Sequence, residues 1–309
     1  MNGVSPSVAV VVTCSGSPEQ LTATIDAVRG QDYEGLLSII VVVEDGLKDG
    51  AERSLSQSTA DQAVTVTVND RTPGTLGARN VGILWSQAEL VAFCECGDIW
   101  APAKVRRQIE VLVANEDVGF VGSGVLLDNE DESVKLVRHT SRVTFRDLLR
   151  APVHEAHAST LMMRREELIE RIGLLDEEAP AAFFGEYEWL LRATRLTDLL
   201  LVPAVLVTAQ STDSETSGGD QQTRLDGLRY LLDTYPEFET DPTGHSRLLR
   251  QMAVATAALG DRRGAWELTK KSFSLPPAEG PGGRIGAFAS DIPASLGSLP
   301  FGRRKARVS

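Results

Sequence analysis

The residues of this chain best suited to chemistry are acidic side chains that follow short runs of apolar, β-branched residues. Asp45 follows one such run, and Glu95 and Asp98 follow another. The carboxyl ends of parallel strands share one edge of a sheet, where open α/β sheets bind ligands. Carboxylates gathered there hold a divalent cation or accept hydrogen bonds from a ligand. Each aspartate alone is explained as a turn or helix-capping residue, but the set indicates a binding site.

The elements that must position these side chains follow the rhythm of βαβ units. This rhythm predicts an α/β fold with a Rossmann-like, mostly parallel central sheet flanked by helices. Predicted strands in the first half cover residues 7–13, 37–44, 64–69 and 90–95, and predicted helices cover 18–31, 76–85 and 103–115. After a strand at 120–127 the rhythm changes, with strands at 159–163 and 199–208 and helices at 166–172 and 186–195.

Charge and hydropathy limit the partners and the compartment. The 309 residues carry 31 Lys and Arg against 43 Asp and Glu, a formal net charge of −12. A chain this acidic lacks the basic face that nucleic-acid binding requires, so we expect no nucleic-acid partner. No apolar run reaches the roughly 18 residues of a membrane-spanning helix, and no secretory signal pattern is seen. We therefore expect a cytoplasmic protein whose three cysteines are reduced thiols.

The sequence pattern of the C-terminal part indicates packing elements and not catalytic residues. Leucine-rich helical patterns follow residue 220 and indicate packing against the domain or a homodimer contact. The basic end at 302–307 is explained as a solvated terminus or, alternatively, as a peripheral contact with the inner face of an anionic membrane. His154 and His157 have metal-like spacing, but no third zinc ligand accompanies them in the sequence. Neither a P-loop nor a nucleophile elbow is present.

Six segments carry a resemblance to a known family. They are VVVTCSGSPEQL (10–21), VVVEDGLKDG (41–50), PGTLGARNVGI (73–83), FCECGDIWAPAKV (93–105), STLMMRREELIERIGLLDE (159–177) and GEYEWLLR (185–192). In this order they resemble glycosyltransferase family 2, over roughly residues 7–210. The family's acidic cluster precedes a Trp, a Pro and a Lys, matched here by Trp100, Pro102 and Lys104.

The resemblance implies a GT-A fold and an inverting transferase. A nucleoside-diphosphate sugar, such as a UDP-sugar, would donate the sugar to a hydroxyl acceptor in polysaccharide, glycoconjugate or glycosylated-metabolite synthesis. The implied GT-A domain covers residues 1–215, with a nucleotide-binding half at 1–127 and an acceptor half at 128–215. A helical region at 216–275 and a Gly/Pro-rich tail at 276–309 follow it, and the tail is expected to pack weakly.

The resemblance also assigns roles to single residues. Thr13 and Ser15 would border the nucleotide base, and Asp45 would accept a hydrogen bond from it. Arg79 would supply positive charge to the diphosphate, or else is an exposed helix arginine. Glu186 would be the catalytic base that takes the proton of the acceptor hydroxyl, or else is an acid in the first turn of a helix.

The acidic cluster implies a metal and also departs from the family pattern. Glu95 and Asp98 would hold Mg²⁺ or Mn²⁺ together with diphosphate oxygens. Gly97 replaces a usual ligand, and Gly185 replaces the first acid of the family's Glu-Asp pair. These two glycines favour the alternative function, a catalytically impaired relative that serves as a nucleotide-binding or scaffold module.

Overall fold

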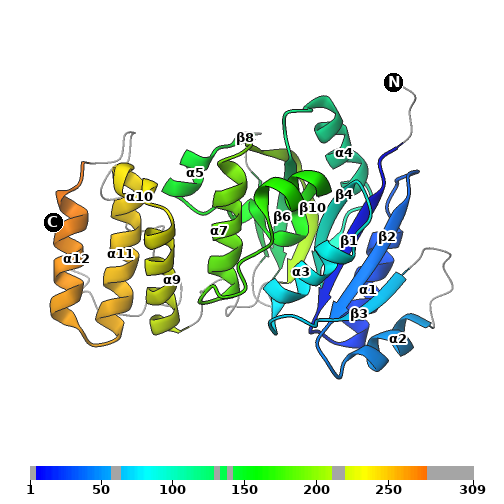
Figure 1. Cartoon of the computed structure of the whole chain (residues 1–309), viewed down its shortest axis with the longest axis horizontal. Helices are drawn as coiled ribbons and strands as arrows, with labels where there is room; N and C mark the ends of the chain where they lie inside the picture. The colour runs from blue at the N-terminus through cyan, green and yellow to red at the C-terminus, as the bar shows by residue number, and fades with distance from the viewer. Residues whose placement is uncertain (1–4, 57–63, 129–132, 138–141, 211–219, 277–309) are drawn as a thin grey trace, which may run out of the picture.

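The computed structural model describes residues 5–56, 64–128, 133–137, 142–210 and 220–276. These residues form an α/β domain around a ten-stranded sheet, followed by a group of C-terminal helices (Figure 1). The strand order is β3-β2-β1-β4-β9-β6-β10-β5, with β7 paired to β6 and β8 paired to β10. The predicted α/β class, central sheet and C-terminal helical extension are confirmed, whereas the predicted tail lies outside the described residues from 277 onward.

The first half is a parallel sheet centred on β1, whose seven residues are all buried. β1 pairs in parallel with β2 and β4, and β2 pairs in parallel with β3. A strand buried on both faces has no need of alternating polar residues, which explains its continuous apolar run. The elements are β1 (Val8–Cys14), α1 (Pro18–Arg29), β2 (Leu37–Val43), α2 (Lys48–Ser56), β3 (Val64–Val68), α3 (Thr75–Trp85) and β4 (Leu90–Glu95).

The second half continues the same sheet through β9, which pairs antiparallel with both β4 and β6. β10 is parallel to β6 and antiparallel to β5 and β8. The elements are β5 (Ile99–Trp100), α4 (Lys104–Ala114), β6 (Phe120–Asp128), β7 (Ser133–Leu136), β8 (Arg142–Val143), α5 (Phe145–Arg150), η1 (His154–Ala156), η2 (Ala158–Thr160), β9 (Met162–Arg164), α6 (Arg165–Glu167), η3 (Leu168–Ile172), α7 (Ala182–Thr194) and β10 (Leu199–Gln210).

Three predicted elements of the second half have different limits in the structure. The strand expected from residue 159 begins at Met162, because a 3₁₀ turn, η2, precedes it. The helix expected at 166–172 is the short α6 followed by one wide π turn, η3. The helix expected from residue 186 begins at Ala182, so Glu186 lies in its second turn.

Two apolar cores cover the two faces of the sheet. Val11 of β1 belongs to the core that includes side chains of α3 and α7, whereas Val10 and Val12 belong to the core that includes side chains of α1 and α4. α3 lies very close to β1, because a Cβ added at Gly82 would stand 2.1 Å from Val11 Cγ1. This close packing fixes the helix that carries Arg79 against the central strand.

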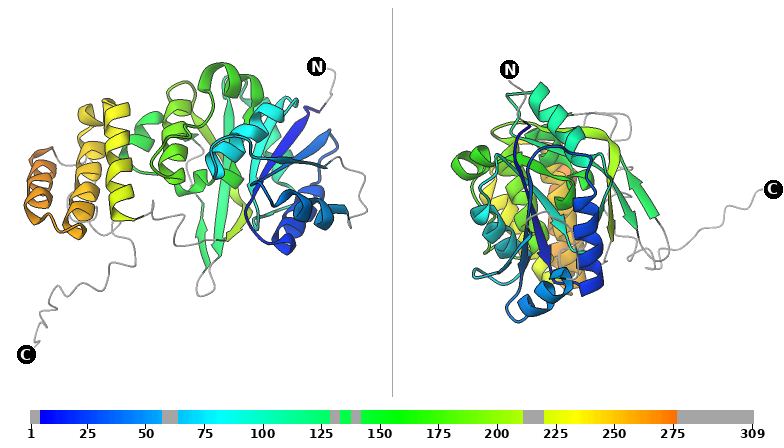
Figure 2. Two further views of the ribbon diagram at one scale, coloured as in Figure 1. Left: turned by 60° about the horizontal axis from the view of Figure 1, so that its bottom comes forward. Right: turned by 90° about the vertical axis from the view of Figure 1, so that its right-hand side faces the viewer.

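The C-terminal helices extend the molecule away from the first half. They are α9 (Gln221–Thr234), α10 (Glu237–Thr240), α11 (Pro242–Ala258) and α12 (Arg262–Ser274). α11 lies between α9 and α12, and α12 forms the end of the long axis opposite β3 and α2, as two directions of view show (Figures 1 and 2). Within the described ranges, no helix combines the length and apolarity needed to cross a membrane.

Candidate active site

The acidic residues predicted at the sheet edge lie in the tight turn between β4 and β5. Glu95 ends β4, and Asp98 donates its backbone N–H to the Glu95 carbonyl at 3.0 Å. Gly97 has φ +100°, a backbone conformation that residues with a side chain rarely adopt. A carboxylate residue at this position would strain the turn, so Gly97 has a structural reason to replace the family's usual acid.

Asp98 is buried, with 3% of its surface exposed. The Ser159 hydroxyl donates to Asp98 Oδ2, and the Gln210 backbone N–H donates to Oδ1 at 3.2 Å. Burial raises the pKa of Asp98 to about 6, with a further contribution from the negative charge of Glu95. Because burial disfavours the ionised form of this carboxylate, a cation placed beside it would stabilise that form.

His157 completes a group of three side chains that could hold a metal ion. Its Nε2 lies 3.6 Å from Glu95 Oε2, and its Nδ1 lies 3.8 Å from Asp98 Oδ2. One ligand atom from each of the three residues falls within 4.8 Å of the others. Two carboxylates and one imidazole suit Mn²⁺, and the two carboxylates alone suit Mg²⁺ when phosphate oxygens complete the coordination. The residues present therefore fit the predicted divalent cation.

Arg79 joins the predicted base to the predicted metal ligand. Its Nη1 donates to Glu186 Oε1 at 2.6 Å, and its Nη2 donates to Glu95 Oε1. Arg79 is only 3% exposed, so the alternative of an exposed helix arginine is wrong. Burial disfavours charge on Glu95, but Arg79 and then His157 outweigh burial and lower the pKa of Glu95. The three side chains form one charged cluster at the sheet edge.

Glu186 reaches this cluster because α7 approaches α3 closely at Gly185. A Cβ added at Gly185 would lie 2.6 Å from Leu76 Cδ1 and 3.1 Å from the Ala179 Cβ. Any larger residue would push α7 outward and move Glu186 with it. The alternative reading of Glu186 as a first-turn acid is wrong, since α7 begins four residues earlier at Ala182.

The residues predicted to contact the nucleotide lie at the same sheet edge, and Thr13 is the register partner of Glu95 across β1 and β4. Thr13 is buried in β1, and Ser15 is exposed just beyond it. Asp45 is exposed after β2, and its neighbour Glu44 accepts hydrogen bonds from Asn69 Nδ2 and the Gly74 N–H, both at 3.0 Å. Glu44 thus holds the segment that leads into α3 and leaves Asp45 open to solvent.

A pair formed by Asn80 and Glu177 connects α3 to the segment before α7. Asn80 Nδ2 donates to Glu177 Oε1 at 2.6 Å, and the Asn80 side chain exchanges two hydrogen bonds of 2.9 Å with the Leu175 backbone. Glu177 also accepts from Arg71 and from the Thr72 N–H. Burial opposes its charge, but these hydrogen bonds lower the pKa of Glu177 to about 2.

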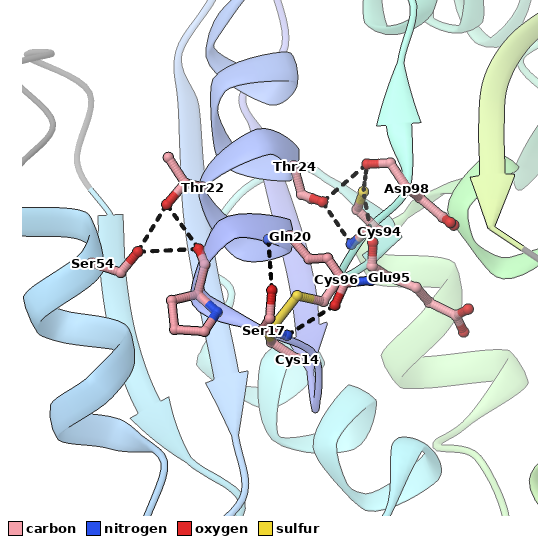
Figure 3. The surroundings of a disulfide bond; sticks show 12 residues. Cys14, Ser17, Gln20, Thr22, Thr24, Ser54, Cys94, Glu95, Cys96 and Asp98 are labelled. Atoms are coloured by element: carbon pink, nitrogen blue, oxygen red, sulfur yellow. Dashed lines mark hydrogen bonds between the residues drawn. A yellow bond between two sulfur atoms is a disulfide. The ribbon is translucent and has the colours of Figure 1, made fainter.

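Cys14 and Cys96 form a disulfide between the ends of β1 and β4 (Figure 3). Their Cα atoms are 4.8 Å apart, and the Cys96 N–H donates to the Thr13 carbonyl at 3.0 Å. The prediction of three reduced thiols is therefore wrong for these two, while Cys94 is a free, buried cysteine. The bond joins neighbouring strands, since Cys14 ends β1 and Cys96 directly follows the last residue of β4.

The Thr24 hydroxyl of α1 holds the turn that carries Cys96 and Asp98. It accepts the Gly97 N–H at 2.9 Å and donates to the Asp98 carbonyl at 3.0 Å (Figure 3). The turn is therefore fixed to α1 by hydrogen bonds and to β1 by the disulfide. The acidic edge of the site rests on a rigid support.

A small pocket lies beside the Arg79–Glu186 ion pair. Its remaining walls are apolar, and they include Phe93, Trp189 and Leu190. An apolar wall beside a carboxylate excludes water and strengthens the electrostatic interactions there.

Sequence reasoning missed His157 and Ser159 as members of the site. The histidine was considered with His154 as a zinc pair, whereas its neighbours in space are carboxylates from a different strand. The side chain of His154 lies outside the described part of the structure. The available signal was a histidine and a serine placed just before a strand that must pair with the acidic strand.

Comparisons with known proteins agree with this geometry. The model of the family described as Glycosyl transferase family 2 matches residues 9–173. An uncharacterized glycosyltransferase of Rickettsia typhi is 25% identical over 222 residues, which cover 70% of this chain and 67% of the relative. The UDP-Glc:alpha-D-GlcNAc-diphosphoundecaprenol beta-1,3-glucosyltransferase WfgD of Escherichia coli is 22% identical over 143 residues, 46% of this chain and 55% of WfgD. For some other relatives the match covers only about a third of the relative's length, such as 33% for one from Rickettsia conorii.

Solved structures share the fold at low identity. TarS 1-349 of S. aureus in complex with UDP superposes with a TM-score of 0.57 at 12% identity, covering 91% of this chain and 99% of that chain. The mannosyltransferase PcManGT of Pyrobaculum calidifontis, in complex with GDP-Man and Mn²⁺, gives a TM-score of 0.54 at 19% identity, with 87% and 80% covered. The fold is therefore of the predicted GT-A type. Because the family model matches more than half of this chain, the chain belongs to glycosyl transferase family 2.

Proposed function

We propose that this protein is an inverting glycosyltransferase, which moves a sugar from a nucleoside-diphosphate sugar to a hydroxyl acceptor. The observation that carries the proposal is the cluster in which Arg79 holds both Glu186 and Glu95 at the carboxyl edge of the sheet. Such a cluster places a proton acceptor beside a group of carboxylates that suits a cation–diphosphate complex.

The donor would bind along the ends of β1, β2 and β4. Thr13, Ser15 and Asp45 lie at this edge, and Asp45 is free to accept a hydrogen bond from a nucleotide base. The solved relatives TarS and PcManGT bind UDP and GDP-Man at a shared fold, which supports a nucleotide-sugar donor for this chain. Which nucleotide it takes is a matter for direct binding measurements.

Glu186 would act as the base. A carboxylate within hydrogen-bond reach of the acceptor hydroxyl takes its proton as that oxygen attacks the anomeric carbon. The attack comes from the side opposite the leaving diphosphate, so the configuration inverts in one displacement. Arg79 would orient the Glu186 carboxylate through their hydrogen bond, and the apolar wall formed by Phe93 and Trp189 would limit water near the reacting atoms.

Glu95, Asp98 and His157 would hold a divalent cation. When bound, such an ion neutralises charge on the leaving diphosphate. These side chains bring two carboxylates and an imidazole to one place, and Ser159 fixes the orientation of Asp98.

The test combines nucleotide binding with turnover. Calorimetry with UDP, GDP and dTDP, each with and without Mn²⁺, should show cation-dependent binding of one of them. Glu186→Gln should lower turnover by about a hundredfold or more while donor affinity stays close to that of the wild type. Unchanged turnover in this variant removes Glu186 from the mechanism. Failure of all three nucleotides to bind overturns the proposed transferase activity.

A second candidate function is a nucleotide-binding or scaffold module without turnover. It is favoured by one observation, the commitment of both Glu186 and Glu95 to the same buried arginine. A module of this kind would bind the nucleotide as tightly as an enzyme but release no diphosphate from any nucleotide sugar offered with an acceptor. Equal nucleotide affinity of wild type and Glu186→Gln, with no turnover in either, would select this function.

A further inference from the structure

The outward surface of α12 combines aromatic and basic side chains. We define the α12 face as Arg262, Arg263, Trp266, Lys270 and Phe273, all of them exposed. Trp266 is 61% exposed and Phe273 is 44% exposed, so two aromatic side chains lie among basic ones on this surface. We propose that the α12 face binds the surface of an anionic lipid membrane.

Helical spacing places these side chains together. α12 packs on α11 through the buried Ala265 and Ser272. Trp266 and Phe273 are seven residues apart, so they lie on one side of the helix about two turns apart. Arg262 and Lys270 stand one turn before and one turn after Trp266, on the same side. The acidic Glu267 lies on the same exposed side, one turn after Arg263, and forms an exposed ion pair with Lys270 at 2.8 Å.

This combination matches helices that lie in a membrane interface. In such helices, Trp and Phe enter the boundary between head groups and acyl chains, while Lys and Arg contact anionic head groups. Neither Arg262 nor Arg263 has a carboxylate partner among the described residues, so both guanidinium groups are available. The ion pair of Lys270 is exposed and therefore weak enough to exchange for a phosphate.

Basic residues are concentrated at the C-terminal end of the chain, and acidic residues are in excess in the rest of it. Residues 262–309 contain nine Lys and Arg against three Asp and Glu, which leaves 22 against 40 in residues 1–261. An anionic surface attracts the C-terminal end and repels the rest of the chain. Because α12 forms one end of the long axis (Figure 1), the protein would stand on this end with the nucleotide-binding half directed away.

A second copy of the chain is a less suitable occupant of the α12 face. A two-fold contact brings the same patch of each copy together, so the basic side chains of one α12 face would lie opposite those of the other. Like charges at such a contact oppose association, whereas phosphate head groups neutralise them. Charge complementarity thus favours the membrane over a homodimer.

The inference goes beyond the proposed transfer reaction and is tested without measuring it. The full chain is sedimented with vesicles of phosphatidylcholine alone or with about 30% phosphatidylglycerol added. The wild type should bind only the anionic vesicles, with affinity that falls as salt increases. The double variant Trp266→Ser, Phe273→Ser and the single variant Arg263→Glu should each bind at least about tenfold more weakly.

Trp85 provides the matched control, because it is an exposed tryptophan, 53% exposed, on α3. Trp85→Ser should bind anionic vesicles as well as the wild type. Undiminished binding by the α12 variants, or equal binding of the wild type to neutral vesicles, overturns the proposal. Failure of the wild type to bind anionic vesicles also overturns it. Light scattering provides a further check, because α12 variants that dissociate a dimer and still bind vesicles would show that the face is a dimer contact. Nucleotide calorimetry on the same samples keeps these outcomes separate from failure of the proposed function.

Discussion

At the scale of single residues, Arg79 is the centre of the candidate site. A buried guanidinium must be paired, and here it is shared by two carboxylates that the reaction would use for different purposes. The planar fork of arginine makes this possible, because two nitrogens point at two acceptors at once. The geometry assigns Arg79 a positioning role toward Glu186 in addition to the charge that the sequence suggested it supplies to the diphosphate.

Replacing Arg79 with lysine tests this positioning role. Lysine keeps the charge but ends in a single ammonium group, which cannot bridge both carboxylates in the same geometry. We expect Arg79→Lys to lower kcat by about ten- to a hundredfold, with a smaller change in donor KM. Arg106→Lys is the control, because Arg106 forms only exposed ion pairs. Equal kcat for Arg79→Lys and the wild type would contradict the role.

Glu177 makes stability depend on pH. Its pKa is lowered from 4.5 to about 2, so it stabilises the fold above pH 4.5, and this stabilisation is lost as pH falls from 4.5 toward 2. Glu177→Gln should lower the free energy of unfolding by about 1–2 kcal/mol at neutral pH. The difference from the wild type should shrink near pH 3, as urea unfolding across this range will show. The neighbouring exposed Glu178→Gln should have little effect, and a pH-independent difference for Glu177→Gln would refute the explanation.

At the scale of elements, both glycines that depart from the family pattern serve the path of the backbone. Gly97 has the positive φ that the turn between β4 and β5 requires, and Gly185 allows α7 to lie against α3. The missing carboxylates are therefore consistent with a working site, since His157 stands beside Asp98 and Arg79 reaches Glu186 directly.

Gly185→Ala tests the approach of the two helices. The added methyl group would meet Leu76 Cδ1 at 2.6 Å, and the cost of overpacking should exceed the gain in helix propensity. We expect a loss of about 1–3 kcal/mol in the free energy of unfolding, together with lower turnover as Glu186 moves. Adding Leu76→Ala should recover part of the lost stability and part of the lost turnover, because it opens space for the methyl group. Gly50→Ala on α2, where an added Cβ has no neighbour within 4 Å, is the control for helix propensity alone and should raise the free energy of unfolding by up to about 1 kcal/mol.

The disulfide between β1 and β4 predicts sensitivity to reductant. It links residues 82 positions apart, so it restricts the unfolded chain considerably. Dithiothreitol should lower the free energy of unfolding by roughly 2–4 kcal/mol in the wild type and leave Cys96→Ser unchanged. Cys94→Ser should keep the response, because Cys94 is free. A wild-type melting curve that is identical with and without dithiothreitol would show that the bond contributes nothing to stability.

At the scale of the whole molecule, most elements of the first half could be predicted from the sequence, but the helix α2 and the two-residue strand β5 were missed. Continuous valine runs identified β1 and β2, and the Ser17–Pro18 start of α1 is formed by the capping contacts that these residue types favour. Glu95 and Asp98 were selected from their place after a predicted strand, Arg79 and Glu186 were selected on the resemblance, and the structure brings all four together. These features depend on local spacing or on short motifs, which a sequence displays directly.

What the sequence could not predict are contacts made between distant strands. The pairing of Cys14 with Cys96 needs the register of β1 against β4, and the approach of His157 to Asp98 needs the antiparallel insertion of β9. The length of α7 was also missed, because Ala181 and Ala182 carry no capping signal. In each case the deciding interaction lies outside the segment that a pattern covers.

The insertion of β9 has a consequence for how the chain folds during synthesis. Residues 162–164 complete the sheet between β4 and β6, so a nascent chain that ends near residue 128 leaves β4 with an open edge. Such an edge pairs readily with other chains, which makes the intermediate prone to aggregation. The sheet is therefore continuous only when the strand that lies between β4 and β6 has emerged from the ribosome.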